Sequence, residues 1–108
     1  MTDLSRLKAN FRQTKPWRQL RERLRKERRF DQLTGARLSR QYELHHMRLT
    51  DDMQEYKDLS DPEMFMCLNN LSHKSLHWAY EQYQKDPAFL DRFNDAVRRM
   101  DELSKQPS

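Results

Sequence analysis

The chain has 108 residues, a length that suits one small domain with a compact core. Hydrophobic and charged residues each make up 35%, and the two Trp, four Tyr and five Phe argue against a wholly disordered chain. A single cysteine excludes an internal disulfide, and no segment approaches the length of a signal peptide or a membrane span, so we expect a folded cytoplasmic protein.

The net charge of +4 is unevenly distributed along the chain. Residues 1–40 carry 13 of the 21 Lys and Arg but only 4 of the 17 acidic residues, whereas residues 41–108 carry the other 8 and 13. A basic half favours a polyanionic partner, of which nucleic acid is the commonest. A solvated basic helix is an equally acceptable interpretation of such a charge run.

The first half predicts a flexible arm followed by a basic amphipathic helix. Residues 1–10 are polar and show no strong capping pattern, so we expect an arm there. From Pro16, the segment "PWRQLRERLRKERRF" places Trp17, Leu20 and Leu24 on one helical face, with proline where a helix begins. The opposite face is rich in arginine, available to solvent or to phosphates.

The middle of the chain predicts two short strands joined by a loop. Gly35, the only glycine, indicates a turn before the extended segment "RQYELHHM". The acidic segment "RLTDDMQEYKDLSDPE" lacks periodicity and is expected to be a long loop. The apolar run "MFMCL" fits a buried strand, in which Cys67 is a core residue rather than a nucleophile.

Two helices and a short tail are predicted for the remainder. The first starts at Asn69 or Asn70 and ends near Pro87, and the second follows directly and ends before a tail at 104–108. Their expected apolar stripes are Leu71, Leu76, Ala79, Tyr80 and Tyr83 on the first helix, then Phe89 or Leu90 with Phe93, Val97, Met100 and Leu103 on the second. The predicted fold is α+β and mostly helical, with one domain over residues 11–103.

The four histidines form two pairs on this strand–loop–strand–helix unit. His73 and His77 are spaced i, i+4, which places both on one helical face within reach of one divalent ion. Such a pair alone is weak evidence, because it also occurs by chance on helix surfaces. His45 and His46 end the first strand, and neighbours in a strand point to opposite sides. One of them could therefore supply a third ligand while the other acts as a general base.

These segments together resemble a known family. "YELHHM" followed by "HKSLH" resembles the HNH nuclease motif of the ββα-metal fold, and "FRQTKPWRQLRERL" and "LSDPEMFMCLNNLSHKSLHW" resemble the lead-in and the ending of many small HNH domains. The resemblance covers about residues 11–78 and implies a ββα-metal core at about 36–85. Small HNH proteins of this kind are frequent in bacteria and phages, which implies the cytoplasm of a bacterial or phage-infected cell.

The resemblance also implies a set of roles. It makes His45, His73 and His77 the metal ligands and His46 the general base of an endonuclease that hydrolyses phosphodiester bonds in DNA. The family uses magnesium, manganese, nickel or zinc, and all-histidine ligation favours zinc or a transition metal. A chain this short leaves little room for a recognition domain, so we expect little sequence specificity.

Two departures from the family pattern support an alternative. Met64 stands where the middle Asn of the motif is usual, and methionine cannot make the hydrogen bonds of that Asn. The four cysteines of the zinc knuckle found in many members are also missing, and Asp31, Thr34, Asn69 and Ser72 occupy their places. The alternative hypothesis is a catalytically inactive scaffold that binds nucleic acid or inhibits a protein. A third hypothesis is a helical interaction module in which the histidines have no shared function.

Five basic residues are candidates for contact with DNA, the most expected partner. They are Arg18, Arg21, Arg25 and Arg29 on the polar face of the basic helix and Lys74 beside a predicted metal ligand. Each is equally compatible with simple solvation, and a lysine on an exposed helix is usually unremarkable. A protein partner could instead use the acidic half, and nothing in the sequence indicates a membrane.

Overall fold

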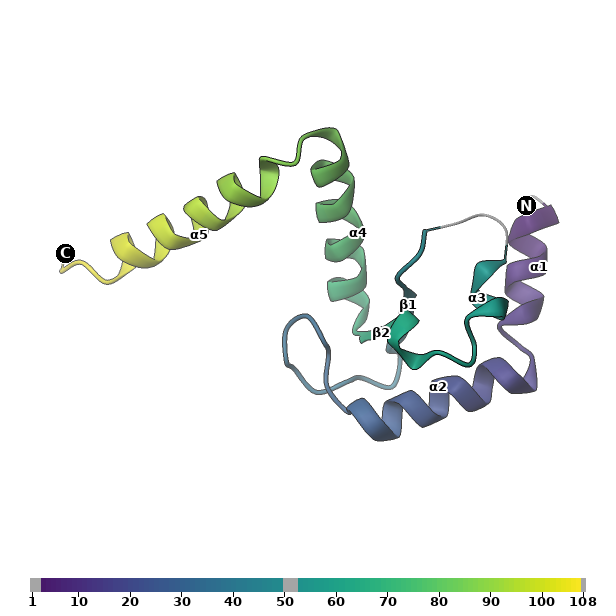
Figure 1. The fold of residues 1–108 in the computed structure, drawn as a ribbon. Coiled ribbons are helices and arrows are strands. Elements are labelled where there is room, and N and C mark those ends of the chain that lie inside the picture. The colour runs from purple at the N-terminus through teal and green to yellow at the C-terminus, as the bar shows by residue number, and fades with distance from the viewer. Residues whose placement is uncertain (1–2, 50–52, 108) are drawn as a thin grey trace. The chain divides into compact units, whose positions relative to one another are not determined.

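A computed structural model describes residues 3–49 and 53–107 (Figure 1). The predicted class, α+β and mostly helical, is confirmed, because six helices and one two-stranded antiparallel sheet lie in the described residues. In chain order the elements are α1 (Asp3–Phe11), α2 (Lys15–Arg28), β1 (Glu43–His46), α3 (Gln54–Lys57), β2 (Phe65–Leu68), α4 (Asn70–Lys85) and α5 (Phe89–Ser104), with the 3-10 helix η1 (Pro62–Met64) directly before β2.

The chain divides into two compact units, residues 1–73 and 74–108. The boundary falls inside α4, which is one continuous helix. The prediction of a single domain over residues 11–103, with a ββα-metal core at about 36–85, stays a prediction.

The core of the first unit forms between α2 and the sheet. As the spacing predicted, α2 buries Trp17, Leu20 and Leu24, and the Trp17 ring meets the edge of Phe65 on β2 with centroids 5.8 Å apart. The buried apolar set is Phe11, Trp17, Leu20, Leu24, Leu38, Tyr42, Phe65 and Cys67. Cys67 is fully buried, in agreement with its predicted role as a core residue.

The sheet determines the direction of the two adjacent histidines. In the antiparallel pair, His45 lies opposite Met66 and His46 opposite Phe65. Successive side chains of a strand point to opposite faces. The His46 ring accordingly packs on Phe65 at 5.1 Å between centroids, whereas the His45 ring packs on His73 of α4, also at 5.1 Å.

The prediction of a flexible arm over residues 1–10 is wrong for the residues of this segment that the structure describes. Residues from Asp3 onward form α1, and Phe11 at its end is only 6% exposed. The Phe11 ring contacts Trp17 and Tyr56, with centroids 5.5 and 5.6 Å away. One buried aromatic anchors this helix, and a single anchor leaves no periodic signal in the sequence. Residues 1–2 of the predicted arm lie outside the described residues.

The predicted loop between the strands contains two short helices, α3 and η1. Asp61 caps η1, because its carboxylate accepts a hydrogen bond from the amide of Glu63 at 3.1 Å. Residues 50–52 of this predicted loop lie outside the described residues.

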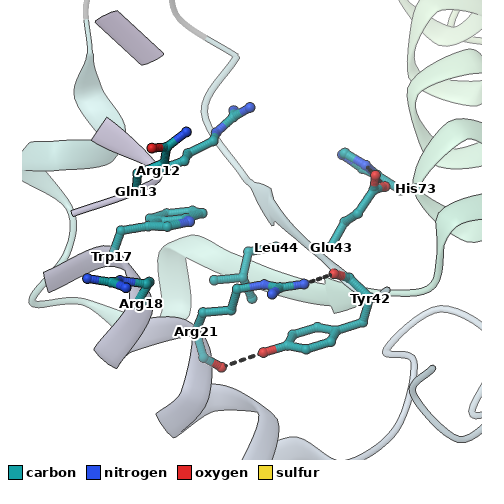
Figure 2. A pocket seen from close by; sticks show the side chains of 9 residues that line it. All are labelled: Arg12, Gln13, Trp17, Arg18, Arg21, Tyr42, Glu43, Leu44 and His73. Atoms are coloured by element: carbon teal, nitrogen blue, oxygen red, sulfur yellow. Dashed lines mark hydrogen bonds and ion pairs between the residues drawn. The ribbon is translucent and has the colours of Figure 1, made fainter. Parts of the chain in front are cut away.

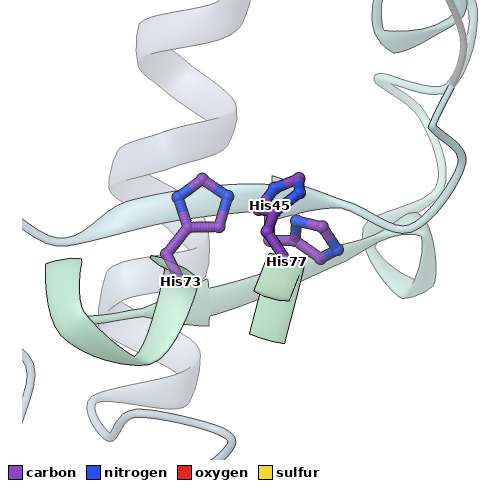
Figure 3. Close-up of side chains that lie close together, drawn as sticks. All are labelled: His45, His73 and His77. Carbon is purple, nitrogen blue, oxygen red and sulfur yellow. The ribbon is translucent and has the colours of Figure 1, made fainter. Parts of the chain in front are cut away.

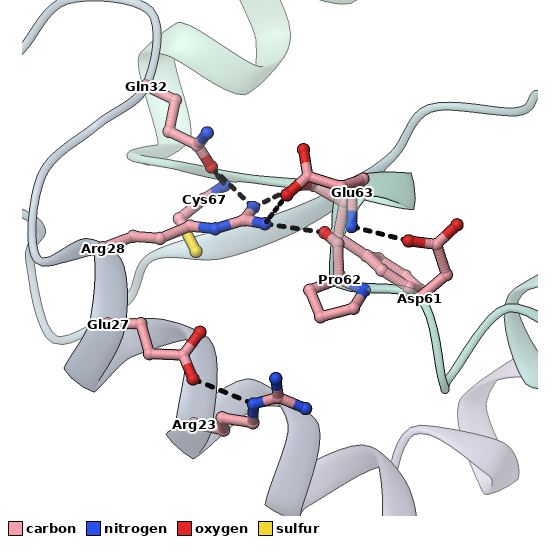
Figure 4. Close-up of polar contacts among 9 residues, drawn as sticks. Arg23, Glu27, Arg28, Gln32, Asp61, Pro62, Glu63 and Cys67 are labelled. Atoms are coloured by element: carbon pink, nitrogen blue, oxygen red, sulfur yellow. Dashed lines mark hydrogen bonds and ion pairs between the residues drawn. The ribbon is translucent and has the colours of Figure 1, made fainter.

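Arg28, at the end of α2, joins the helix to β2 (Figure 4). Its guanidinium donates to the carbonyl of Pro62 at 2.7 Å and to the carbonyl of Phe65. It also donates at 2.9 Å to the side-chain oxygen of Gln32, which accepts a second hydrogen bond from the amide of Cys67 at 2.8 Å. Because one planar group donates to three acceptors, the segment after α2 is held against β2.

The last two helices do not bury the predicted apolar stripes. Within the second unit Trp78 contacts Phe89 and Phe89 contacts Phe93, at 5.5 and 5.7 Å between ring centroids. No residue of α5 is buried, and its apolar side chains from Leu90 to Leu103 are about half exposed or more. Leu71, in the first turn of α4, is 76% exposed. Periodicity indicated an apolar face correctly, but the packing within the second unit leaves that face of α5 exposed.

No helix among residues 3–49 and 53–107 has both the length and the apolar character needed to cross a membrane.

Replacement of Leu24 by Ala tests the core of the first unit. Leu24 is fully buried, so Leu24→Ala should lower the free energy of unfolding by about 2–4 kcal/mol through lost burial and a cavity. Leu103→Ala makes the same change at a helical site that is 53% exposed, and it should cost less than about 1 kcal/mol. Denaturant unfolding of the two variants measures the difference, and equal losses would contradict this core.

Candidate metal centre

Three of the four histidines come together at the junction of β1 and α4 (Figure 3). His45, His73 and His77 each offer one imidazole nitrogen, and the three nitrogens lie within 4.8 Å of one another. His45 projects from β1, and the other two lie one turn apart on α4. The i, i+4 spacing and the alternation of the strand together produce this arrangement.

The three side chains suit a divalent ion. Two nitrogens bound to one tetrahedral zinc lie roughly 3.3 Å apart, so small rotations of the rings would bring these donors to bonding positions. Neutral imidazole nitrogens suit zinc and the later transition metals better than magnesium, which prefers oxygen. The predicted ligand set is thus close enough to bind an ion, and the identity of that ion stays a prediction.

The centre is open on one side. His45 is buried, His73 is partly buried and His77 is exposed. Three protein ligands leave a fourth tetrahedral position for water or substrate, as in catalytic rather than structural zinc sites. The exposed His77 places one side of the centre at the protein surface.

Glu43 is a residue of this centre that the sequence analysis missed. Its carboxylate oxygen Oε2 lies 2.5 Å from Nδ1 of His73, and its other oxygen accepts a hydrogen bond from the side chain of Asn70 at 3.3 Å. A carboxylate in this position holds the proton on Nδ1, so that Nε2 of His73 is the nitrogen that would bind a metal. The available signal was its place two residues before His45, on the same face of β1.

His46 lies on the other face of β1 and uses both ring nitrogens. Nδ1 is 2.7 Å from the carbonyl of Arg48, and Nε2 is 2.8 Å from the carboxylate of Asp58. A carbonyl can only accept, so Nδ1 carries a proton, and an ionised Asp58 requires a proton on Nε2 as well. In this arrangement His46 has no lone pair for a proton, so a role as general base requires both release of the Asp58 contact and loss of the Nε2 proton, and it stays a prediction.

Asp58 is held in its ionised form. Burial alone would raise its pKa, but hydrogen bonds from His46 and Gln54 and the charge of Arg48 hold the pKa of Asp58 below its ordinary value. In the sequence, Asp58 lies in a segment without periodicity, so no role was predicted for it. No local pattern relates it to His46, twelve residues earlier.

Met64, where the HNH resemblance leads us to expect an Asn side chain, contributes a backbone atom. The amide of Met47, the residue after His46, donates to the carbonyl of Met64 at 2.8 Å. The segment after His46 is therefore attached to the start of β2 although methionine lacks the hydrogen-bonding side chain of the usual Asn.

Two of the predicted DNA-contacting residues line a hollow beside the metal centre (Figure 2). This hollow, of about 590 Å³, is bordered by Arg12, Gln13, Trp17, Arg18, Arg21, Tyr42, Glu43, Leu44 and His73. The Arg21 guanidinium donates to the carbonyl of Tyr42 and lies 4.2 Å from the centre of its ring. Arg21 is therefore part of the packing of α2, whereas Arg18 is exposed.

The other predicted contacts lie elsewhere. Arg25 and Arg29 line a second hollow, of about 310 Å³, together with Arg37. Arg29 ends α2 with a positive φ of 57°, and its Nε donates to the carbonyl of Lys26 at 3.4 Å. Lys74 is exposed on α4, directly after His73. The four arginines thus divide between two hollows of the first unit.

Comparisons with protein-family models, with curated proteins and with solved structures found no match.

Replacement of Glu43 by Gln tests its role in orienting His73. Glu43→Gln removes the charged acceptor at Nδ1, so the affinity for zinc should fall about 10- to 100-fold. Glu102→Gln makes the same change on the exposed surface of α5 and should leave the affinity unchanged. Titration calorimetry measures both, and equal affinities in the two variants would show that Glu43 does not support the centre.

Asp58 should make stability sensitive to acid. The pKa of Asp58 is lower in the folded state than its ordinary value of 3.8. The ionised carboxylate therefore stabilises the folded state above about that pH, and this stabilisation is lost as the pH falls further. Asp58→Asn should therefore weaken the dependence of thermal stability on pH in the acid range. Melting curves from pH 2 to pH 7 provide the comparison, and an unchanged acid dependence would argue against the His46–Asp58 interaction.

Proposed function

We propose that this chain is a metal-dependent endonuclease of the HNH type, which hydrolyses phosphodiester bonds in DNA with little intrinsic sequence specificity. The observation that supports this most is the approach of His45, His73 and His77 at the junction of β1 and α4. The solvent-accessible side of this centre leaves room for a phosphate group.

The side chains of the centre have separate tasks in this proposal. His45, His73 and His77 hold the ion, and Glu43 keeps the His73 ring in one orientation. A bound divalent ion supplies positive charge to a phosphate oxygen. Arg18, on the hollow that His73 also lines, neutralises a phosphate of the bound strand.

Proton transfer is assigned to His46, as the HNH resemblance implies. Hydrolysis needs a base within hydrogen-bonding reach of the attacking water. The Nδ1 contact of His46 with the carbonyl of Arg48 fixes the ring, and Nε2 is the atom that would accept the proton. The proposal therefore requires two changes when DNA binds: the contact between Nε2 and Asp58 opens, and Nε2 passes its proton to solvent before it accepts one from the attacking water.

A second candidate function is a catalytically inactive scaffold that binds nucleic acid or inhibits a protein. Two observations favour it. Both ring nitrogens of His46 are engaged, and Met64 offers only its backbone to the segment that carries this histidine. Such a scaffold could retain the metal centre without catalysing hydrolysis.

Nicking of supercoiled plasmid tests the first proposal. Protein freed of metal by chelation receives magnesium, manganese, nickel, cobalt or zinc singly, and nicking should appear only with a metal. His46→Ala should reduce the rate at least about 100-fold by loss of the base, and His77→Ala should do so by loss of a ligand. Arg98→Ala, on the exposed surface of α5, should leave the rate unchanged.

The same experiment separates the two candidates. If the folded protein binds zinc but does not nick DNA with any of the five ions, the endonuclease is excluded and the inactive scaffold is supported. Nicking that persists in His46→Ala would instead exclude His46 as the base. Circular dichroism of each variant establishes that it is folded, which matters because His46 is buried.

A further inference from the structure

One carboxylate joins the turn after α2 to the start of α4. Asp31 is 1% exposed, and its Oδ1 accepts hydrogen bonds from the amides of Leu33 and Thr34, both at 2.8 Å. Its Oδ2 accepts a hydrogen bond from the amide of Asn69 at 2.8 Å, and the side chain of Ser72 also donates to the carboxylate of Asp31. Asp31 thus satisfies donors from two segments that are far apart in sequence.

A second side chain, that of Asn69 at the start of α4, reaches back to the backbone of the segment after α2. Its oxygen accepts from the amide of Ser39 at 2.8 Å, and its nitrogen donates to the carbonyl of Arg37 at 3.0 Å. Gly35 closes the turn with a positive φ of 78° and an amide that donates to the carbonyl of Asp31 at 2.8 Å. The turn after α2 and the start of α4, together called the corner below, are therefore joined by hydrogen bonds from the side chains of both Asp31 and Asn69.

Asp31 is charged at every pH near neutrality. Burial by itself would raise its pKa, but hydrogen bonds from Ser72, Thr34, Asn69 and Leu33 lower the pKa of Asp31 to about 2. The negative charge also lies at the N-terminus of α4, where the aligned peptide dipoles of the helix stabilise an anion.

The spacing of the residues around this carboxylate is that of a four-ligand metal site. Asp31 and Thr34 form one pair separated by two residues, and Asn69 and Ser72 form another. In structural zinc sites, two such pairs of cysteines bind one ion. Here Asp31 joins the two pairs by accepting hydrogen bonds from the amides of Thr34 and Asn69 and from the side chain of Ser72.

We propose that Asp31 is a positioning residue of the metal centre, whose carboxylate joins these two segments in place of a structural metal ion and thereby fixes the start of α4. Ser72 immediately precedes His73, and His77 follows one turn later on the same helix. The inference rests on the proposed function only in assuming that the histidines bind an ion.

A matched pair of variants tests the link between Asp31 and the histidines. Asp31→Asn places an NH2 group against one of the amide donors, so we expect zinc affinity at the histidines to fall at least tenfold in protein that is still folded. Asp61→Asn alters an exposed carboxylate that accepts one local amide, and affinity should not change. A lower melting temperature with unchanged zinc affinity would show a structural role only and would overturn the inference.

A four-cysteine variant tests the geometry of the corner directly. The protein carrying Asp31→Cys, Thr34→Cys, Asn69→Cys and Ser72→Cys should bind one cobalt ion more than the unaltered chain. The absorption bands of tetrahedral thiolate-bound cobalt should appear, and the histidines should keep their affinity. A folded variant that binds no additional ion would contradict the inference.

These tests remain informative if other parts of the account fail. Absence of zinc binding in the unaltered chain would refute the histidine centre, and the cysteine variant and the hydrogen exchange of the Asn69 amide would still test the corner. If Asp31→Asn does not fold, Ser72→Ala removes one donor and should lower zinc affinity in the same direction. Unchanged affinity in that variant would overturn the positioning role.

Discussion

The candidate site depends on the pairing of β1 with β2. The register that places His46 opposite Phe65 directs His46 into a buried polar contact with Asp58 and directs His45 toward α4. A shift of one residue would exchange these two directions, because side chains alternate along a strand. The pairing of β1 with β2 therefore fixes both the position of His45 in the metal centre and the position of His46, the candidate base. A change of register would displace both side chains together.

This register is held by a small core and a few buried polar groups. Trp17 and Leu24 cover β2 from the side of α2, and Arg28 satisfies the carbonyl of Phe65 in the strand itself. Asp31 performs the corresponding task at the other end of β2, where α4 begins. A short chain buries little apolar surface, so well-satisfied polar contacts of this kind contribute much of the precision of the site.

The features that the sequence predicted are those with a local periodic pattern. Alternation in "YELHHM" and the i, i+4 pair at His73 and His77 were sufficient to predict a site between a strand and a helix. Glu43 and Asp58 were not assigned, because each pairs with a histidine through a contact that no repeat in the sequence encodes. The apolar stripe on α5 was read correctly as a stripe, but a stripe does not reveal whether another element covers it.

The most direct test of this account is a cobalt titration of the unaltered chain and of four variants, each with one histidine replaced by Ala. We predict that one ion binds each chain. The affinity for cobalt should be at least tenfold lower in His45→Ala, His73→Ala and His77→Ala and unchanged in His46→Ala. Binding that is unaffected by His77→Ala, or lost in a folded His46→Ala variant, would contradict the assignment of the three ligands.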